Sequence, residues 1–204
     1  AERSVLFSRA YCQSPVCGPS RVSFYTGRYM SSHGAGYNNV PFSIDQWTLG
    51  DYMRTVGIRS VLVGKTHMAP DRAGMERLTI EGNSDLGVWI GQCGFEPFER
   101  DDGLHPNQSL NPNLAYNNYL RAQGYSSDNP WHDFANSAEG PKGEILSGWQ
   151  MRHARLPARV ADAHSETPYM TGRAIDFLEQ AGDKPWCLHL SLIKPHWPYV
   201  VPHP

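Results

Sequence analysis

Apolar and polar positions along the chain predict strands that alternate with helices. Residues 59–63 and 186–193 are rich in apolar and β-branched side chains, which is typical of strands buried on both faces of a parallel sheet. Residues 4–10 form a shorter candidate strand. We therefore expect an α/β fold with a mostly parallel central sheet and flanking helices.

The clearest helix covers residues 166–181 and is ended by Gly182. Its apolar residues recur at i, i+4, i+7, i+8 and i+11, so they form one core-facing stripe. The stripe consists of Met170, Ala174, Phe177, Leu178 and Ala181. This pattern predicts packing in the core and not a cofactor site.

Other helices are indicated by their termini. Thr48 is the expected N-cap of a helix that runs through Val56, with Asp51 at the capping-box position and Gly57 after its end. A second, short helix is expected over residues 116–123.

Between residues 71 and 163 the pattern is weak, and Gly, Pro, Asn and Asp are frequent. We interpret this segment as a long excursion over the sheet, of the kind that often shapes a substrate pocket. The run Arg-Asp-Asp-Gly at residues 100–103 is interpreted as a solvated turn rather than a metal loop. The whole chain, residues 1–204, is expected to form one partial domain.

Composition argues against two broad classes of binding protein. The 204 residues include 18 Lys and Arg against 20 Asp and Glu, which gives a net charge of −2. This balance provides no extended basic surface for nucleic acid or for an anionic membrane. No run approaches the roughly 20 apolar residues of a membrane span. Any anion-binding site must therefore be local.

One local candidate is the run Cys17-Gly18-Pro19-Ser20-Arg21. Pro19 has the backbone torsion that the first turn of a helix requires, so a helix is expected over residues 19–26. Cys17 would lie at the helix N-terminus, whose free N–H groups and partial positive charge suit sulfate or phosphate. Arg21, four residues later, would project near the same end.

The run C-x-P-S-R, followed by T-G-R at residues 26–28, resembles the signature of the type I sulfatases of the alkaline phosphatase superfamily. The resemblance implies that Cys17 is oxidised to formylglycine by a formylglycine-generating enzyme. In that family one hydroxyl of the hydrated aldehyde attacks sulfur or phosphorus, and the second lets the covalent ester collapse. The alternatives are a buried structural cysteine and a Cys12–Cys17 disulfide.

Lys65 and His67 follow the strand predicted at residues 59–63, at the sheet edge where α/β proteins bind ligands. An extended segment would point both side chains the same way. Their run G-K-x-H is similar to one that many sulfatases carry at this place. The resemblance implies that Lys65 bridges the nucleophile and the substrate oxyanion, and that His67 hydrogen-bonds the hydrated aldehyde.

The second predicted sheet strand is followed by Lys194 and by His196 within a Pro-His-x-Pro run. That run resembles the sulfatase segment whose histidine lies near the leaving-group oxygen; the alternative is a histidine packed between prolines. Lys194 has no firm family counterpart and is interpreted as a surface charge. Residues 31–41, which include His33 and Asn38, are rich in Gly and Asn and are expected to form a loop. Asn38 matches a substrate-contacting asparagine of the phosphonate monoester hydrolases, although asparagine in such a loop usually just makes a turn.

The family also builds a divalent metal site, for calcium or manganese, from an early Asp-Asp pair and a late Asp with His or Asn. Neither set is found in this sequence, so Cys17, as formylglycine, is the only metal ligand that we assign. The resemblance therefore implies an alkaline-phosphatase-like sandwich that is incomplete at both ends. We expect these 204 residues alone not to turn over substrate.

The expected function is hydrolysis of a small-molecule sulfate ester through formylglycine and a divalent metal. One alternative is a phosphonate monoester or phosphodiester hydrolase of the same superfamily, a branch that the body of the chain resembles, including residues 94–103. The other is a non-catalytic relative that binds sulfated ligands. A homo-oligomer and a cytoplasmic rather than periplasmic location are further expectations, which no residue pattern decides.

Overall fold

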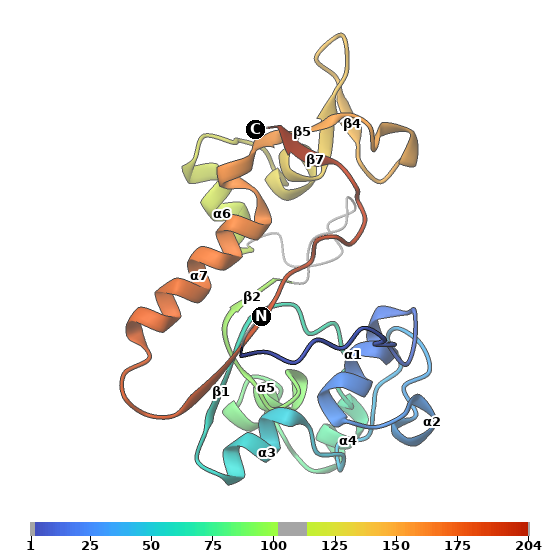
Figure 1. Ribbon diagram of the computed structural model, residues 1–204, viewed down its shortest axis with the longest axis vertical. Helices are drawn as coiled ribbons and strands as arrows, with labels where there is room; N and C mark the ends of the chain where they lie inside the picture. Colours follow the sequence, from blue (N-terminus) through green and yellow to red (C-terminus); the bar gives the residue numbers. More distant parts are fainter. Residues whose placement is uncertain (1–2, 102–113, 204) are drawn as a thin grey trace. The chain divides into compact units, whose positions relative to one another are not determined.

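The computed structural model of the chain describes residues 3–101 and 114–203 (Figure 1). The chain divides into two compact units. The first comprises Ala1–Ser60 and Thr66–Glu96, and the second comprises Val61–Lys65 and Pro97–Pro204. The sequence-based expectation that residues 1–204 form one partial domain stays a prediction.

Short helices make up most of the regular structure of the first unit: α1 (Cys17–Thr26), α2 (Met30–His33), α3 (Leu49–Thr55), α4 (Arg72–Arg77) and α5 (Asp85–Gly91). Apolar side chains fill its interior. Among them, the rings of Tyr25 and Phe95 pack edge to face with centroids 5.9 Å apart. Cys93 is also buried, and burial raises the pKa of its thiol, as expected for an inert structural cysteine.

The predicted helix ends in this unit are largely confirmed. α1 begins at Cys17 rather than at Pro19, so Cys17 belongs to the first helical turn. α3 follows Thr48, and its capping box is complete, with the backbone N–H of Thr48 donating to Asp51 Oδ2 at 2.9 Å. Gly57 then adopts a φ of 75°, in the left-handed region that favours glycine after a helix.

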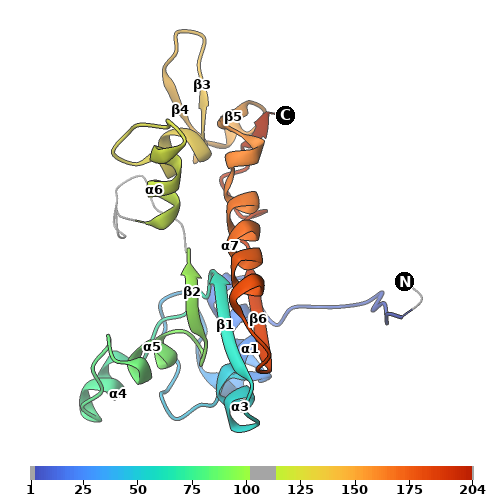
Figure 2. The same cartoon turned by 90° about the vertical axis from the view of Figure 1, so that its left-hand side faces the viewer.

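A parallel three-stranded sheet, with most of its residues in the second unit, has the strand order β2-β1-β6 (Figure 2). Its strands are β1 (Arg59–Gly64), β2 (Glu96–Arg100) and β6 (Trp186–Ser191). The N–H groups of Asp101 and Lys65, just beyond β2 and β1, donate to the carbonyls of Gly64 and Ser191 at 3.1 and 3.0 Å. The carboxyl ends of the three strands therefore meet at one edge of the sheet.

Strand predictions elsewhere need correction. Residues 4–10 form no strand: Val5 is 80% exposed, and no strand of the described residues pairs with this segment, so nothing supplies the ladder hydrogen bonds. β2 lies inside the segment interpreted as an excursion. β6 is half-buried rather than buried, and it ends at Ser191.

The prediction of a solvated turn at residues 100–103 is wrong for its first two residues. Arg100 is the last residue of β2, and the side chain of Asp101 is buried, with 1% of its surface exposed. The hydrogen bond from the N–H of Asp101 to Gly64 draws this residue against β1. Residues 102 and 103 lie outside the described residues.

The second unit also contains a four-stranded sheet in the order β4-β3-β5-β7. Its strands are β3 (Ser137–Glu139), β4 (Ile145–Ser147), β5 (Pro157–Ala161) and β7 (Val201–His203). Helical segments in this unit are α6 (Ala115–Ala122), the π-helix η1 (Trp131–Ala135), and the 3₁₀ turns η2 (Met151–His153) and η3 (Asp162–His164). α6 confirms the short helix expected from the sequence. Its Tyr116 and Leu120 share one core cluster with Trp131 and Val160.

The long helix α7 (Glu166–Gln180) confirms the clearest sequence prediction. Met170 and Ala174 are buried and pack with Val63 of β1, whereas Leu178 of the predicted stripe is 47% exposed. Phe177 packs edge to face against Phe98 of β2, with centroids 5.6 Å apart. The apolar stripe therefore covers one face of the parallel sheet, but it is narrower than the sequence predicts.

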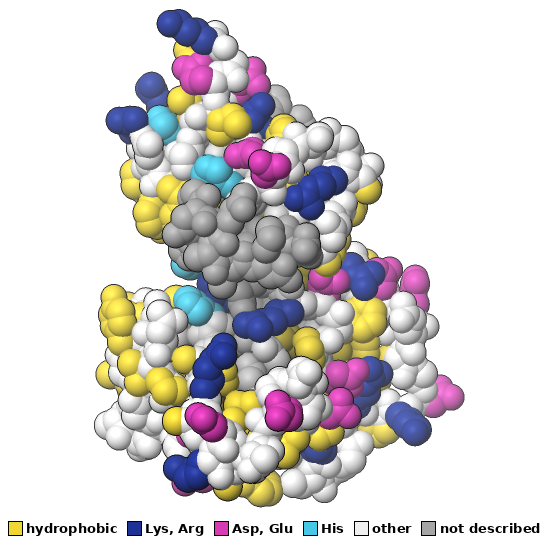
Figure 3. Space-filling model, turned by 180° about the vertical axis from the view of Figure 1, so that it is seen from behind, with side chains coloured by type: hydrophobic (Ala, Val, Ile, Leu, Met, Phe, Trp, Pro, Cys, Tyr) yellow, Lys and Arg dark blue, Asp and Glu magenta, His cyan; other side chains and the backbone are white. Residues whose placement is uncertain are grey.

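Helix length and surface charge bear on whether the chain could cross or bind a membrane. In the described part of the chain, no helix has both the length and the apolar character that a bilayer crossing needs. Figure 3 shows basic and acidic side chains interspersed over one face of the molecule, in keeping with the net charge of −2.

Candidate functional site

Cys17 lies in the first turn of α1 and is partly exposed. The turn begins at Val16, whose backbone is extended and whose carbonyl accepts the N–H of Ser20 at 3.1 Å. Ser14 fixes the approach to the helix, since its Oγ accepts the N–H of Val16 at 3.1 Å. Cys12 and Cys17 both carry free thiols, so the alternative of a Cys12–Cys17 disulfide is wrong for this structure.

Asn38 reaches the same helix end from a loop twenty residues away. Its Oδ1 accepts the backbone N–H of Gly18 at 2.8 Å and lies 3.4 Å from Sγ of Cys17, which donates to it. A Cβ on residue 18 would lie only 2.8 Å from this oxygen, so the contact requires glycine there. The sequence placed Cys17 and Asn38 at one site, and the structure brings these two side chains into contact.

A histidine joins α1 to the segment that follows it. Nε2 of His33 lies 2.8 Å from Oγ of Ser23, and its Nδ1 accepts the N–H of Ala35 at 3.1 Å. Burial lowers the pKa of His33, so the neutral ring is favoured. A hydrogen bond with the backbone of Pro19 has a smaller, opposite effect on this pKa. His33 belongs to α2 rather than to the predicted loop, and its role here is to join α2 to α1.

Lys65 follows β1 directly and is buried, with 4% of its surface exposed. Two residues on, His67 adopts a left-handed backbone with φ of 48°. The extended segment expected from the sequence therefore ends before His67, and the argument that both side chains point the same way is wrong. A non-glycine residue in this region is uncommon and is often found at functional sites, which favours a specific role for His67.

His196 lies on the exposed loop that follows β6. Its N–H donates to the carbonyl of Ile193 at 2.9 Å, and its Nδ1 contacts the carbonyl of Trp197. The peptide bonds that precede Pro195 and Pro198 are both cis. His196 is exposed, so its ring lies at the surface and is not packed between the prolines.

Lys194 is not the surface charge expected from the sequence. Its Nζ donates to Oδ1 of Asn136 at 2.8 Å and to the carbonyl of Pro198 at 2.6 Å. Burial lowers the pKa of this ammonium, and the nearby carboxylate of Glu166 opposes the shift. Sequence reasoning missed this contact because Asn136 is 58 residues away, and no local pattern connects them.

The predicted site residues are distributed over both units. Cys17, Arg21, Asn38 and His67 belong to the first unit, whereas Lys65 and His196 belong to the second. Within the first, Arg21 is one turn further along α1 than Cys17. Within the second, Lys65 follows β1 and His196 follows β6, which are neighbouring strands. Convergence of all six on one site stays a prediction.

A metal site is not formed by the residues that the structure describes. They contain no group of three or more His, Cys, Asp or Glu side chains placed to hold an ion. Around Cys17, the oxygen in contact is the amide oxygen of Asn38. The donors present in the described residues therefore do not fit the calcium or manganese site that the resemblance implies, beyond Cys17 itself.

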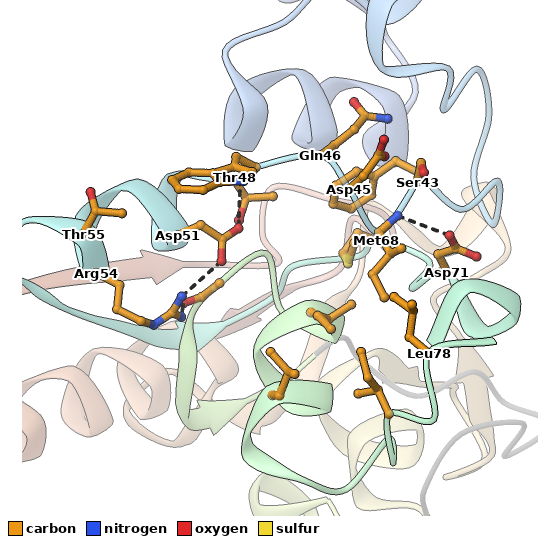
Figure 4. A pocket seen from close by; sticks show the side chains of 17 residues that line it. Ser43, Asp45, Gln46, Thr48, Asp51, Arg54, Thr55, Met68, Asp71 and Leu78 are labelled. Atoms are coloured by element: carbon orange, nitrogen blue, oxygen red, sulfur yellow. Dashed lines mark hydrogen bonds and ion pairs between the residues drawn. The ribbon is translucent and has the colours of Figure 1, made fainter. Parts of the chain in front are cut away.

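A pocket of about 510 Å³ lies elsewhere in the first unit (Figure 4). Its walls are mostly apolar, with Phe42, Ile44 and Met68 among the lining residues. Two of its lining carboxylates have partners: Asp51 binds Arg54 at 3.1 Å, and Asp71 accepts the N–H groups of Ile44 and Gly74. None of the predicted site residues lines it, so this pocket is separate from the Cys17 region.

Comparison with known proteins gives a consistent result. A family model described as sulfatase matches residues 1–204. The chain is 28% identical over 194 residues to the multifunctional alkaline phosphatase superfamily protein PehA of Trinickia caryophylli, and 27% identical over 204 residues to the choline-sulfatase of Rhizobium meliloti. These matches cover 92% and 98% of this chain and 33% of each relative. The chain thus spans about a third of the length of these curated relatives.

Solved structures confirm the fold. The phosphonate monoester hydrolases of Silicibacter pomeroyi and Agrobacterium radiobacter superpose with TM-scores of 0.69 and 0.67, each at 23% identity. They cover 92% and 95% of this chain, which covers 34% of each of them. The predicted alkaline-phosphatase-like α/β fold is therefore correct. Since the sulfatase model matches all of residues 1–204, the chain belongs to the sulfatase family.

Proposed function

We propose that this chain supplies the nucleophile of a hydrolase that cleaves sulfate esters. The observation that carries the proposal is the position of Cys17: it lies in the first turn of α1, against the side chain of Asn38. A helix N-terminus favours a bound anion, and Arg21 adds a positive charge one turn away. The family to which the chain belongs supports the same reaction class.

The proposed chemistry depends on conversion of Cys17 to formylglycine by a separate oxidising enzyme. A hydroxyl of the hydrated aldehyde then forms a bond to sulfur, and the alcohol leaves with a proton. Loss of a proton from the second hydroxyl lets the carbonyl form and breaks the carbon–oxygen bond to the sulfate, which leaves. Water then adds to the aldehyde and restores the hydrated form, so that water need not attack sulfur.

Roles for the other residues follow from their charge and position. The ammonium of Lys65 and the ring of His67 stabilise negative charge that develops on the transferred group. His196, on an exposed loop, delivers the proton to the leaving alcohol. Asn38 orients the helix end and the substrate. These assignments stand on the sequence motifs and on the geometry within each unit.

A phosphonate monoester or phosphodiester is the second candidate substrate class. It is favoured by Asn38, which matches a substrate-contacting residue of that branch, and by the run at residues 94–103. Sulfate and phosphonate esters present tetrahedral oxyanions of similar shape, so one site can accept both. A relative that only binds sulfated ligands is the third candidate. The intact run from Cys17 to Arg21 argues against it, because a binding protein has no chemical need for this motif.

The test begins with a mass spectrum of the peptide that contains Cys17, from cells that possess the modifying enzyme. We expect formylglycine, and an unmodified thiol in active protein would refute the proposal. Cys17→Ser should stall after a single attack, because a serine ester has no second hydroxyl to expel the oxyanion. An aryl sulfate, an aryl phosphonate monoester and a phosphodiester, assayed in parallel, decide the substrate class.

A further inference from the structure

Lys194 closes the loop that carries His196. Its Nζ donates to the carbonyl of Pro198, four residues later, so one side chain bridges the two ends of residues 194–198. A long, flexible side chain loses rotamer entropy when it is fixed in this way. The contact therefore needs a second attachment to hold the loop in one conformation.

Asn136 provides that attachment. Its Oδ1 accepts from Lys194 Nζ at 2.8 Å, while its own Nδ2 donates to the carbonyl of Trp131 at 3.1 Å. The backbone carbonyl of Asn136 accepts the N–H of Gly148 at 2.9 Å. Asn136 is 1% exposed and makes two hydrogen bonds besides the one with Lys194, so it offers Lys194 a fixed acceptor.

The rest of the loop packs on the same surface. Nε1 of Trp197 donates to the carbonyl of Gly148 at 3.3 Å. The rings of Trp149 and Trp197 pack edge to face, with their centroids 4.8 Å apart. A Cβ on residue 148 would lie 2.4 Å from the carbonyl oxygen of Asn136 and 3.1 Å from Cβ of Pro198. Glycine at this position allows the loop to lie directly against the end of β4.

The backbone on both sides of His196 is thus fastened, while its ring stays exposed. We propose that Lys194 is a positioning residue for His196: through Pro198 and Asn136 it fixes the loop so that the imidazole meets the leaving-group oxygen of the substrate. This role rests on the proposed function of His196 as proton donor. Lys194 itself need not touch the substrate.

Glu166 opposes the effect of burial on Lys194. Burial lowers the pKa of the Lys194 ammonium, and the charge of Glu166 acts against this shift. Glu166 is itself 4% exposed, and its Oε1 accepts Nε1 of Trp131 at 2.9 Å. A half-buried ammonium that lost its acceptors would be costly. Asn136, the Pro198 carbonyl and Glu166 together make the observed position the stable one.

The decisive experiment is a double-mutant cycle in the intact protein, with Lys194→Met, His196→Ala and the double variant. Lys184→Met, which changes an exposed lysine of the same unit, is the matched control. We expect Lys194→Met to lower kcat about tenfold for esters with poor leaving groups, as expected for a displaced proton donor, with little change in KM. In the His196→Ala background the same change should have almost no further effect.

Additive losses in the cycle, or an equal loss for good and poor leaving groups, would overturn the positioning role. If Lys194→Met does not fold, Lys194→Gln, which keeps one donor, is judged by the same criteria. A large effect of His196→Ala with none of Lys194→Met would refute this inference alone. Activity unaffected by His196→Ala would instead refute the proposed role of His196.

A second readout does not depend on turnover. In a Cys17→Ala background, histidine labelled with ¹³C gives a ring signal that is assigned to His196 by its loss in His196→Ala. We expect Lys194→Met to shift or broaden this signal, and Lys184→Met to leave it unchanged. A His196 signal that is the same in all three proteins would show that Lys194 does not fix the loop.

Discussion

The side-chain oxygen of Asn38 accepts the backbone N–H of Gly18 at 2.8 Å. This N–H belongs to the first turn of α1, where helix donors have no partner within the helix. A residue twenty positions away therefore caps the helix that carries Cys17. The capping contact and the candidate nucleophile are adjacent, so changes at Asn38 should affect both stability and the reaction.

We expect Asn38→Ala to lower the free energy of unfolding by about 1 kcal/mol, because the N–H of Gly18 loses its acceptor. Urea denaturation measures this change. Asn39→Gly is the control: Asn39 is exposed and has a φ of 65°, so glycine keeps the backbone and removes no contact with Gly18. Equal losses in the two variants would contradict the capping role.

Asn38→Asp separates the capping contact from the electrostatics. A carboxylate still accepts the N–H of Gly18, so stability should stay close to that of the unchanged protein. The added negative charge beside Cys17 should repel an anionic ester and raise KM several-fold. Kinetics with an aryl sulfate at low ionic strength test this, and an unchanged KM would place the substrate away from Asn38.

Alanine substitutions at two glycines, one in β1 and one in α7, should change stability in opposite directions. Gly64 has a φ of 111°, and a Cβ there would lie 2.1 Å from the carbonyl oxygen of Ser191 in β6. Gly64→Ala should therefore destabilise the protein by about 2–3 kcal/mol or more. Gly172 lies within α7 with open space at its Cβ, so Gly172→Ala should stabilise by roughly 0.5–1 kcal/mol. Thermal unfolding of both variants should show shifts of opposite sign.

The lowered pKa of His33 should make the free energy of unfolding depend on pH. Because burial lowers its pKa in the folded state, the unfolded chain takes up a proton first as the pH falls below about 6.5. The stabilising effect of the neutral ring is thus present above that pH and is lost as the pH falls toward the lowered value. The slope reaches at most about 1.4 kcal/mol per pH unit for one proton.

His33→Gln removes this titration. Urea unfolding of the two proteins across this range should show a shallower pH slope for the variant, and the difference in stability between them should shrink as the pH falls. Parallel curves would mean that His33 does not contribute through its protonation.

Lys65 and His67 should act on the transition state more than on substrate binding. Lys65→Met or His67→Ala should lower kcat on the order of a hundredfold, the usual scale for a lost oxyanion partner, with a smaller change in KM. Steady-state kinetics on the modified protein measure both constants. A variant with unchanged kcat would return that residue to a structural role.

Much of this protein is determined locally. Pro19 favours the first turn of α1 through its fixed φ, and Gly57 follows α3 because glycine readily adopts a positive φ. Thr48 and Asp51, three residues apart, form a capping box. Periodicity also predicts the buried positions Met170, Ala174 and Phe177 of α7, although it wrongly adds Leu178. The run from Cys17 to Arg21 likewise identifies the family, because its chemistry is written in contiguous residues.

The tertiary structure decided what depends on distant partners. Residues 4–10 have strand-like composition, but no neighbouring strand of the described residues pairs with them, whereas β2 becomes a strand because β1 lies beside it. Asp101 is buried by its place after β2, and Lys194 is held by Asn136, 58 residues earlier. A hydrogen bond between residues far apart leaves no local pattern, since its energy depends on the folded backbone that brings donor and acceptor together.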